Sequence, residues 1–441
     1  MARVTLAGSG YPQTDVWGYG GTVPGPVLRA RQGDRLRVVV DNRLPVETTV
    51  HWHGIRLPNA MDGVPHVTQP PIAAGGGRFT YEFALPDAGT FWYHPHLASS
   101  EQLGRGLYGA LVVDEPEPLA VDRDVVWVLS DFRLDREARI VGDFDNFMDA
   151  SHAGRIGNTV VVNGEVRETF EVHAGERIRL RLANTANARI FALSFAGHAP
   201  WVIALDGHPV APHRPERDRV VLGPGMRADL VLDCGAAPGS RHRVLDDFTP
   251  RMAYRLVDLA YSERAPLCAR PPGPVPALAA NPLAEPDLAK AERHRFSFGD
   301  GMMGGMGGMG GGMGGMGGMG GMGGMRGMGG AVWTINGHAV STDESHHARL
   351  LTLRHGRSVV LELANDTAWF HPIHLHGVAF RVLTRNGRPV AHRPWADTAL
   401  LAPRERAEVA FVADNPGDWM FHCHVLEHQA SGMMGVVRIE G

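Results

Sequence analysis

Alternating apolar and polar residues form the main pattern along this chain, and one version of the pattern occurs three times. Residues 33–42, 175–184 and 356–365 each begin with a glycine, continue with alternating apolar side chains and end at an asparagine nine positions after the glycine. Alternation of this kind between two turn signals is typical of a half-buried β-strand. The sequence therefore predicts three copies of one strand-rich unit.

Short runs of the same kind recur through the rest of the chain, whereas long amphipathic helical patterns are scarce. Further strands are predicted at 78–85, 109–114, 124–129, 219–222, 229–233 and 408–412. Many short strands with Gly/Pro turns favour β-sandwiches, and 441 residues are too many for one core. The predicted fold class is all-β, with three consecutive sandwich domains at 1–116, 117–265 and 331–441 and a linker and loop at 266–330.

Composition narrows the classes of function. With 44% hydrophobic and 20% charged residues the chain is typical of a soluble globular protein, and no apolar run is long enough to span a membrane. A net charge of −4 gives no electrostatic support for nucleic-acid binding. Cys234 and Cys268 are expected either to form a disulfide in an oxidising compartment or to remain two free thiols.

Ten histidines, one cysteine and one methionine gather in four short clusters near the two ends of the chain. The clusters are His51-Trp52-His53, His94-Pro95-His96, His371-Pro372-Ile373-His374-Leu375-His376, and His422-Cys423-His424 followed by His428 and Met433. Residues i and i+2 of a strand point to one face, so both imidazoles of a His-X-His can reach one metal. About one such tripeptide is expected by chance, so four together carry weight. Imidazole, thiolate and thioether are the ligands of copper redox sites.

The three-fold repeat explains where two of these clusters lie. His51 and His374 each follow the asparagine of their unit by nine residues, and the middle unit has Leu193-Ser194-Phe195 at that position. We therefore expect the first and third domains to share a metal cluster at their interface and the middle domain to be a spacer. The alternative is that the middle domain binds metal through other histidines, for which the candidates are His198, His208 and His213.

A second register match links the two remaining clusters. Gly89 precedes His94 by five residues, and Gly417 precedes His422 by five residues. Equivalent strands of the first and third domains are therefore expected to supply matching histidine pairs.

Residues 301–330 consist mainly of Gly-Gly-Met repeats, with 19 glycines and 10 methionines, and follow a Pro/Ala-rich linker at 266–290. Such a segment cannot bury enough surface to offset its ordering entropy, so a mobile loop between the second and third domains is expected. One interpretation is a low-complexity linker. The other is Cu(I) binding, because thioethers are soft ligands that select Cu(I). The methionines concerned are Met302, Met303, Met306, Met309, Met313, Met316, Met319, Met322, Met325 and Met328.

In order, spacing and residue type, the four clusters resemble the copper signatures of three-domain multicopper oxidases, the family of bacterial laccases and cuprous oxidases. The resemblance covers nearly the whole chain and implies cupredoxin-like Greek-key sandwiches that bind four copper ions. It implies a type 1 copper held by His371, Cys423 and His428, with Met433 as the weak axial ligand, an arrangement typical of blue copper. The implied ligands of the other coppers are His51 and His374 for type 2, His53, His94 and His424 for one type 3 ion, and His96, His376 and His422 for the second.

The resemblance also implies a reaction, in which donors lose single electrons at the type 1 copper and O₂ is reduced to water at the other three. Asp62 resembles the family's carboxylate near the type 2 copper, where it would relay protons; its alternative role is that of a turn residue before Gly63. Many relatives carry a second acid directly after the type 1 histidine. This chain has Gln429 there, so either Glu427 or a chain of waters is expected to substitute, or O₂ reduction is expected to be slower.

Three functions are compatible with these motifs. The favoured one is a cuprous oxidase in copper tolerance, because of the Gly-Met segment; the second is a laccase that oxidises phenols and aromatic amines. The third, a non-enzymatic copper-binding protein, is disfavoured because the ligand set is complete. One chain holds every ligand, so a monomer is expected. A periplasmic or secreted location is also expected, with an export signal removed ahead of Met1-Ala2-Arg3.

Overall fold

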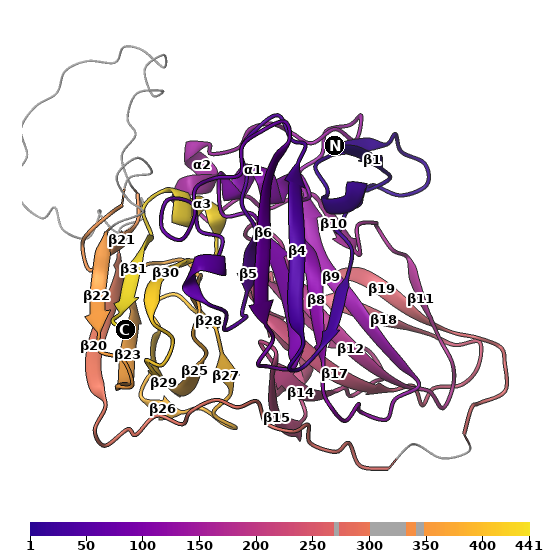
Figure 1. Cartoon of the computed structure of the whole chain (residues 1–441). Helices are drawn as coiled ribbons and strands as arrows, with labels where there is room; N and C mark the ends of the chain where they lie inside the picture. The colour runs from indigo at the N-terminus through magenta and orange to yellow at the C-terminus, as the bar shows by residue number, and fades with distance from the viewer. Residues whose placement is uncertain (269–272, 300–331, 341–347) are drawn as a thin grey trace, which may run out of the picture.

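The computed structural model describes residues 1–268, 273–299, 332–340 and 348–441. The described elements are nearly all strands, arranged as three consecutive sandwiches that Figure 1 shows in indigo, magenta and orange to yellow. This confirms the predicted all-β fold class of three cupredoxin-like domains. The Gly-Met segment and its ten methionines lie outside the described residues.

The first domain combines a four-stranded sheet in the order β3-β8-β7-β5 with the pairs β4-β6 and β1-β2. Its elements are β1 (Ala2–Val4), β2 (Thr14–Val16), η1 (Tyr19–Gly21), β3 (Leu28–Arg31), β4 (Arg35–Asn42), β5 (His51–His53), η2 (Asn59–Met61), β6 (Gly77–Ala84), β7 (Gly89–His94), α1 (Ser99–Gly104) and β8 (Gly109–Asp114).

The second domain has a six-stranded sheet, β10-β9-β12-β17-β14-β15, and a five-stranded sheet, β11-β19-β18-β13-β16. Its elements are β9 (Arg123–Phe132), α2 (Phe147–Ser151), β10 (Thr159–Val162), β11 (Thr169–Val172), β12 (Arg177–Asn184), β13 (Phe191–Phe195), β14 (Trp201–Leu205), β15 (His208–His213), η3 (Glu216–Asp218), β16 (Val220–Leu222), β17 (Arg227–Asp233), β18 (Arg241–Asp246) and β19 (Tyr254–Tyr261).

The third domain has one sheet in the order β21-β20-β23-β29-β25-β26, with β27 also on β25, and a second sheet in the order β22-β31-β30-β24-β28. Its elements are β20 (Glu292–Gly299), β21 (Thr334–Ile335), β22 (Arg349–Leu353), β23 (Ser358–Asn365), β24 (His371–Leu375), β25 (Phe380–Arg385), β26 (Arg388–Pro389), β27 (Trp395–Ala396), β28 (Thr398–Leu401), β29 (Arg406–Val412), β30 (Gly417–Cys423), α3 (Leu426–Ala430) and β31 (Met434–Ile439).

The three repeated runs are the strands β4, β12 and β23, each ending at the expected asparagine. In each copy the asparagine Oδ1 accepts a hydrogen bond, at 3.0 Å, from the backbone N–H two residues later. In each copy its Nδ2 donates to backbone carbonyls, among them Ile72 in the first copy, Leu222 in the second and Ala402 in the third. One buried amide thus closes the strand in every domain, which explains why the sequence repeats it.

Strand β20 differs from the prediction, because the sequence placed residues 266–330 outside the three sandwiches. β20 pairs in parallel with β23, so it is part of the third domain although it precedes the Gly-Met segment in sequence. Its alternating burial is that of a sheet strand, but the Pro/Ala-rich residues before it hid the pattern. The Gly-Met segment therefore falls between two strands of one sandwich, and not between the second and third domains.

Packing joins the first and third domains. One hydrophobic core contains buried side chains of both, for example Trp52 and Phe91 of the first and Phe421 of the third, whereas the second domain has a core of its own. The interface between the two end domains is therefore lined by buried apolar side chains of both.

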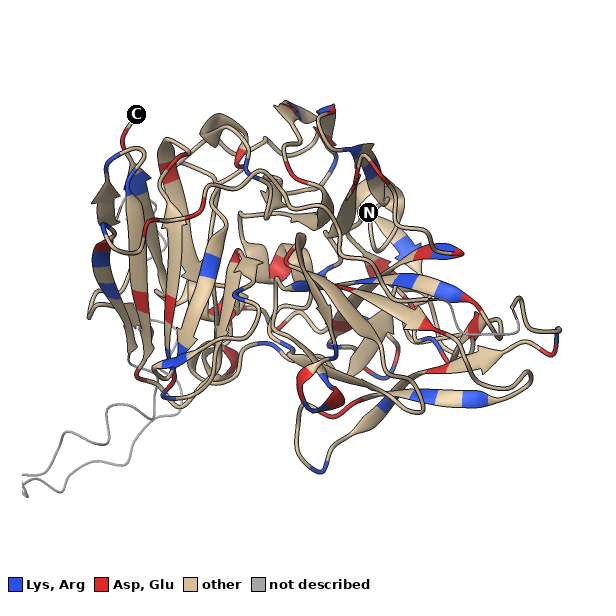
Figure 2. Cartoon of the chain, turned by 90° about the horizontal axis from the view of Figure 1, so that it is seen from below, with Lys and Arg blue, Asp and Glu red and all other residues tan. Residues whose placement is uncertain are grey.

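The surface charge and the state of Cys234 and Cys268 do little to identify the function. Acidic and basic residues are interspersed over the ribbon in Figure 2, as a net charge of −4 suggests. Among the described helices, none has both the length and the apolar character needed to cross a membrane. Cys234 is buried and Cys268 is exposed, and the structure does not join them by a disulfide, so the thiol alternative is the one observed.

Candidate metal centres

Two equivalent strand pairs carry the histidines. In the first domain β5 pairs with β7, which puts His51 opposite His94. In the third domain β24 pairs with β30, which puts His374 opposite His422. Gly89 and Gly417 begin β7 and β30 with the same φ of 149°, so the register match in the sequence reflects a common geometry.

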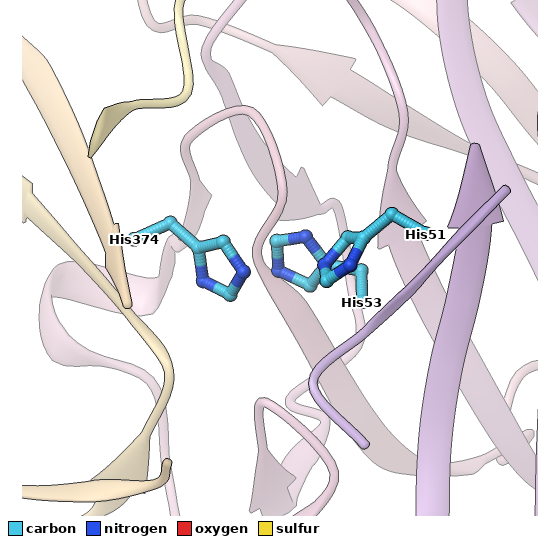
Figure 3. Close-up of side chains that lie close together, drawn as sticks. All are labelled: His51, His53 and His374. Atoms are coloured by element: carbon cyan, nitrogen blue, oxygen red, sulfur yellow. The ribbon is translucent and has the colours of Figure 1, made fainter. Parts of the chain in front are cut away.

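The two strand pairs face each other across the domain interface. Figure 3 shows His51 and His53 reaching from β5 toward His374 of β24. The rings of His53 and His374 stack with centroids 3.8 Å apart, and those of His51 and His376 do the same at 3.8 Å. Every one of these imidazoles is buried.

The structure brings the predicted ligands together in four buried groups whose ligand atoms lie within 4.8 Å of one another. These groups are His51, His53 and His374; His53, His94 and His424; His96, His376 and His422; and His371, Cys423 and His428. The first three adjoin at the interface of the end domains, and the fourth lies in the third domain. A fifth group joins Asp62 to His51 and His376.

Backbone carbonyls fix which nitrogen of each ring faces inward. A carbonyl oxygen can only accept, so Nδ1 must be the protonated donor in His51 to Asp62 O (2.8 Å), His94 to Pro95 O (3.0 Å) and His374 to Asp397 O (2.9 Å). The opposite nitrogen, Nε2, of each finds no hydrogen-bond partner among the described residues. Buried polar atoms are rarely left unpaired, so three converging lone pairs indicate a cation site.

The third group gives the most direct indication of a cation site. His376 donates its Nδ1–H to the Asp62 carboxylate at 2.9 Å, and His422 donates its Nδ1–H to Cys423 O at 2.8 Å. Both Nε2 atoms then carry lone pairs, yet they face each other at 3.1 Å. Two lone pairs repel at this distance unless a metal or a proton lies between them.

The fourth group has the composition predicted for type 1 copper. Cys423 Sγ lies 3.4 Å from His371 Nδ1 and 3.7 Å from His428 Nδ1, and the two Nδ1 atoms are 3.2 Å apart. The outward Nε2 atoms are held by Thr367 Oγ1 for His371 and by His152 O for His428. Here Nδ1, and not Nε2, faces the site.

Met433, the predicted axial ligand, is fully buried beside this group. Its backbone N–H donates to His428 O and its carbonyl accepts from Cys423 N, both at 3.0 Å. The turn after α3 therefore ties the backbone of Met433 to that of two of the three residues of this group.

Burial sets the protonation state of the donors. Loss of solvent lowers the pKa of His94 and of His96 well below the usual range, and neighbouring imidazoles lower both further. Burial lowers the pKa of His428 to about 3. These rings are therefore neutral at physiological pH, which is the form that binds metal. Burial raises the pKa of the Cys423 thiol, so a metal ion must displace its proton.

Asp62 fits both roles expected for it. It ends η2 in a tight turn before Gly63, whose φ is +81° and whose added Cβ would lie 1.8 Å from Val50 O. Its carboxylate also lies 2.9 Å from His376 Nδ1 and 3.2 Å from His51 Nδ1. The turn thus delivers a buried carboxylate to two histidines of different groups.

Glu427 lies elsewhere. Its carboxylate accepts hydrogen bonds from the Arg155 backbone N–H at 3.0 Å and from Asn187 Nδ2 at 3.1 Å, both in the middle domain. Burial raises the pKa of Glu427. Gln429 is also buried, and its Oε1 has no partner among the described residues. The hydrogen bonds of its carboxylate are with the middle domain and, among the described residues, include no histidine of the four groups.

The histidines of the middle domain have other partners. His198 bonds Tyr261 OH at 2.5 Å, His208 bonds Asn281 at 3.0 Å, and His213 stacks on His392. Among described residues, none of the three belongs to a group of three or more candidate ligands.

Several residues around the groups carried no sequence signal. Asp397, Thr398 and Thr367 orient histidine ligands, and His152 caps His428 from a loop of another domain. Single polar residues between motifs look like ordinary turn or strand residues, so only the fold reveals them.

Comparison with known proteins agrees with this geometry. Models of the multicopper oxidase family match residues 1–118, 123–240 and 326–441. A multicopper oxidase of Mycobacterium tuberculosis is 33% identical over 98% of this chain and 84% of the relative. A laccase of Cryphonectria parasitica is 28% identical, with 98% and 80% covered, and a copper resistance protein A homologue of Pseudomonas syringae pv. tomato is 27% identical, with 95% and 88% covered.

A solved structure shows the same fold over the whole chain. The multicopper oxidase from Pseudomonas thermotolerans superposes with a TM-score of 0.84 at 38% identity, covering 99% of this chain and 97% of that one. With three matching domain models, a relative above 30% identity and four converging groups of copper ligands, the chain belongs to the three-domain multicopper oxidase family and is a copper-dependent oxidoreductase.

Proposed function

We propose that this chain couples one-electron oxidation of a small donor, in its native role Cu(I), to the four-electron reduction of O₂ to water. The observation that carries the proposal is the convergence of ten histidines and one cysteine into one thiolate-containing group and three adjoining histidine groups. Copper bound there supplies single-electron acceptance at the first centre and multi-electron reduction of O₂ at the second.

Each centre has its own set of residues in this proposal. A type 1 copper would be held by His371, Cys423 and His428, with Met433 as a weaker fourth ligand. The type 2 copper is held by His51 and His374, and the type 3 pair by His53, His94 and His424 on one side and His96, His376 and His422 on the other. All four coppers are bound within one chain, which supports a monomer.

The tripeptide at the end of β30 links the two kinds of centre. Cys423 belongs to the thiolate group, whereas its neighbours His422 and His424 belong to two different histidine groups. Extended backbone points adjacent side chains in opposite directions, so a few covalent bonds connect the electron-entry residue to the oxygen-reducing centre.

Proton delivery is assigned to Asp62. Its carboxylate lies 2.9 Å from His376 Nδ1 and is only 1% exposed, so it can hand on a proton at the buried centre without admitting bulk solvent. Glu427 is bound to Arg155 and Asn187 of the middle domain, so it serves as a secondary acid only through a chain of waters.

His152 and Trp333 form a cover over the thiolate group, and this cover favours a small donor. His428 is fully buried, and its outward Nε2 donates to His152 O at 2.7 Å. Trp333 packs on His428 with ring centroids 4.4 Å apart and donates to Ala150 O at 2.6 Å. A bulky phenol cannot touch the imidazole past this cover, whereas an electron can pass through the hydrogen bond to His152.

Soft ligands favour Cu(I) as the donor. The Gly-Met segment supplies ten thioethers, and Met148, next to the His152 cover, is 60% exposed. The alternative is a general laccase acting on phenols and aromatic amines, which the laccase relative supports. A non-enzymatic copper-binding role requires neither the buried Cys423 nor the carboxylate at His376.

A periplasmic or secreted location remains part of the proposal, and fractionation of cells expressing the natural gene would test it.

Removal of residues 301–330 tests the choice of donor, with O₂ uptake measured for Cu(I) and for a simple phenol. A second variant keeps the length and replaces the ten methionines by serine, which separates thioether chemistry from steric cover. We expect both variants to lose Cu(I) turnover, and the deletion to retain or raise phenol turnover. Equal changes for the two donors would contradict a Cu(I) role and leave the laccase alternative.

A further inference from the structure

The middle domain contributes no ligand to the four groups among described residues, yet one of its loops reaches the histidines. Gly225, just before β17, has a φ of +86°, and an added Cβ there would lie 2.9 Å from His424 and 3.0 Å from His53. Only a residue without a side chain can bring the backbone this close. The loop of the middle domain is therefore packed directly against two proposed type 3 ligands.

The same loop delivers a buried arginine. Arg227 begins β17, is fully buried, and donates from all five of its N–H positions. Nη1 and Nη2 clasp the Asp397 carboxylate at 2.9 and 2.6 Å, and the remaining donors go to the carbonyl oxygens of Thr90, Gly225 and Asp206 at 2.9–3.1 Å. Arg227 therefore contacts all three domains.

Asp397 connects the Arg227 guanidinium to two proposed ligands, His53 and His374. Its Oδ1 accepts from His53 Nε2 at 2.9 Å, and its backbone carbonyl accepts from His374 Nδ1 at 2.9 Å. His53 is thereby held by Nε2, so that Nδ1 faces the centre, the reverse of His51, His94 and His374. One residue thus sets the ring of a proposed type 3 ligand with its side chain and that of a proposed type 2 ligand with its main chain.

A second carboxylate holds Asp397 in place. Asp206 of the middle domain accepts from the backbone N–H groups of Asp397 at 3.3 Å and Thr398 at 3.2 Å, and from Arg227 N at 2.9 Å. The turn that carries Asp397 is therefore fixed from the middle domain at both its main chain and its side chain.

We propose that Arg227 and Asp397 are positioning residues of the three-copper centre, and that the middle domain is a working part of that centre. The proposal rests on the copper assignment made above. Arg227 must be arginine, because a lysine cannot satisfy a bidentate carboxylate and three carbonyls from one point charge. Partners of metal-bound histidines typically change metal affinity by roughly 10–100-fold when removed.

Arg179 offers a matched control. It lies in β12, next to β17 in the same sheet, is 2% exposed, and clasps Glu115 of the first domain at 2.7 and 2.9 Å and Asp229 at 2.7 and 3.2 Å. It is thus an equally buried arginine that joins the first two domains, and it binds carboxylates that, among the described residues, form no hydrogen bond with a histidine of the four groups.

The experiment compares holoenzyme of the wild type, Arg227→Lys and Arg179→Lys. We would measure copper per chain, the blue absorption of the thiolate site, the electron paramagnetic resonance signal of type 2 copper, and copper retention against a chelator. For Arg227→Lys we expect full blue colour, an altered type 2 signal and roughly 10–100-fold weaker retention of three coppers. For Arg179→Lys we expect a lower unfolding temperature with four coppers and wild-type signals.

Two results would overturn the inference: wild-type signals and retention in Arg227→Lys, or equal disturbance in Arg179→Lys. If Arg227→Lys does not fold, Asp397→Asn, which keeps the volume and removes the charge, carries the same expectations. Failure of the proposed function looks different, because the wild type itself would then lack the three-copper signals.

Discussion

Strand β5 of the first domain carries His51 and His53, and β24 of the third domain carries His374. Their counterpart in the middle domain is β13, with Leu193 and Phe195. His51, Leu193 and His374 each lie nine residues after the asparagine that ends the repeated strand of their domain. In the end domains the strands face each other across an interface, and their histidines converge. In the middle domain Leu193 and Phe195 face inward and pack in that domain's own core.

At this strand position histidines converge in the end domains, where the two strands face each other across the interface. Among the described residues, the middle domain pairs β13 with its own β16 and β18 and fills the position with apolar residues. It acts on the centre from outside instead, through the loop that ends at Arg227. The predictions below test this division, starting with the largest effect.

Asp62→Asn should slow O₂ reduction about 100-fold, the scale of a lost general acid, while the blue colour of the thiolate site persists. Asp246→Asn is the matched change in the middle domain, because Asp246 is also buried and accepts from Ala192 N at 2.9 Å and from Tyr254 OH at 2.7 Å. That variant should lose stability without losing turnover. Turnover of Asp62→Asn at the wild-type rate would remove Asp62 from the proton path.

Leu193→His puts a histidine at the position that the proposed ligands His51 and His374 occupy in the end domains. Because Leu193 is fully buried among apolar side chains, we expect unfolding free energy to fall by about 2–4 kcal/mol. Copper per chain should stay at the wild-type value, measured by metal analysis beside denaturant unfolding. A gain of one copper would show that the strand position alone makes a site.

Asn184→Ala and Asn365→Ala remove the same strand-closing amide from the middle and third domains. Each leaves buried backbone carbonyls unpaired, at a cost of about 1–3 kcal/mol in unfolding free energy. Only Asn365 also accepts from Thr367 Oγ1, at 2.8 Å, and Thr367 in turn holds His371. The blue absorption should therefore shift in Asn365→Ala and remain unchanged in Asn184→Ala. A shift in both variants would mean that loss of the asparagine affects the thiolate site through a general loss of stability.

His208 of the middle domain supplies the smallest effect. Burial lowers its pKa to about 4, whereas an unfolded histidine titrates near 6.5. Below pH 6.5 the unfolded chain takes up a proton that the folded chain refuses, so stability is full above this pH and falls toward pH 4. The slope is about 1.4 kcal/mol per pH unit.

His208→Gln should reduce the total slope by this contribution, with or without copper, in denaturant unfolding at a series of pH values between 7 and 4. An unchanged slope in the variant would show that His208 is not titrating with unfolding.

Much of the site could be predicted from sequence, because spacing within a strand directly sets which side chains share a face. The histidine pairs, Cys423 between two of them and the glycine-to-asparagine strands all follow from local periodicity. Arg227 and Asp397 could not be predicted, since they are 170 residues apart in sequence and a buried arginine in a strand has no local pattern. Strand β20 was not predicted for a different reason. Its partner strand β23 lies beyond the Gly-Met segment in sequence, so only the parallel pairing in the structure shows that β20 belongs to the third domain.

The position of Glu427 was also beyond the sequence. A glutamate one residue before a proposed ligand suggests the metal centre, but its side chain points toward Asn187 and Arg155 of the middle domain. The position of Glu427 in α3, which is only five residues long, sets the direction of its side chain.

The most direct test of the central claim is copper analysis with an absorption spectrum on the purified chain. The account predicts four copper ions per chain and an intense blue band from the Cys423 thiolate, with Cys423→Ser losing the band and one copper. One copper ion or none in the wild type, or four without the blue band, would contradict it.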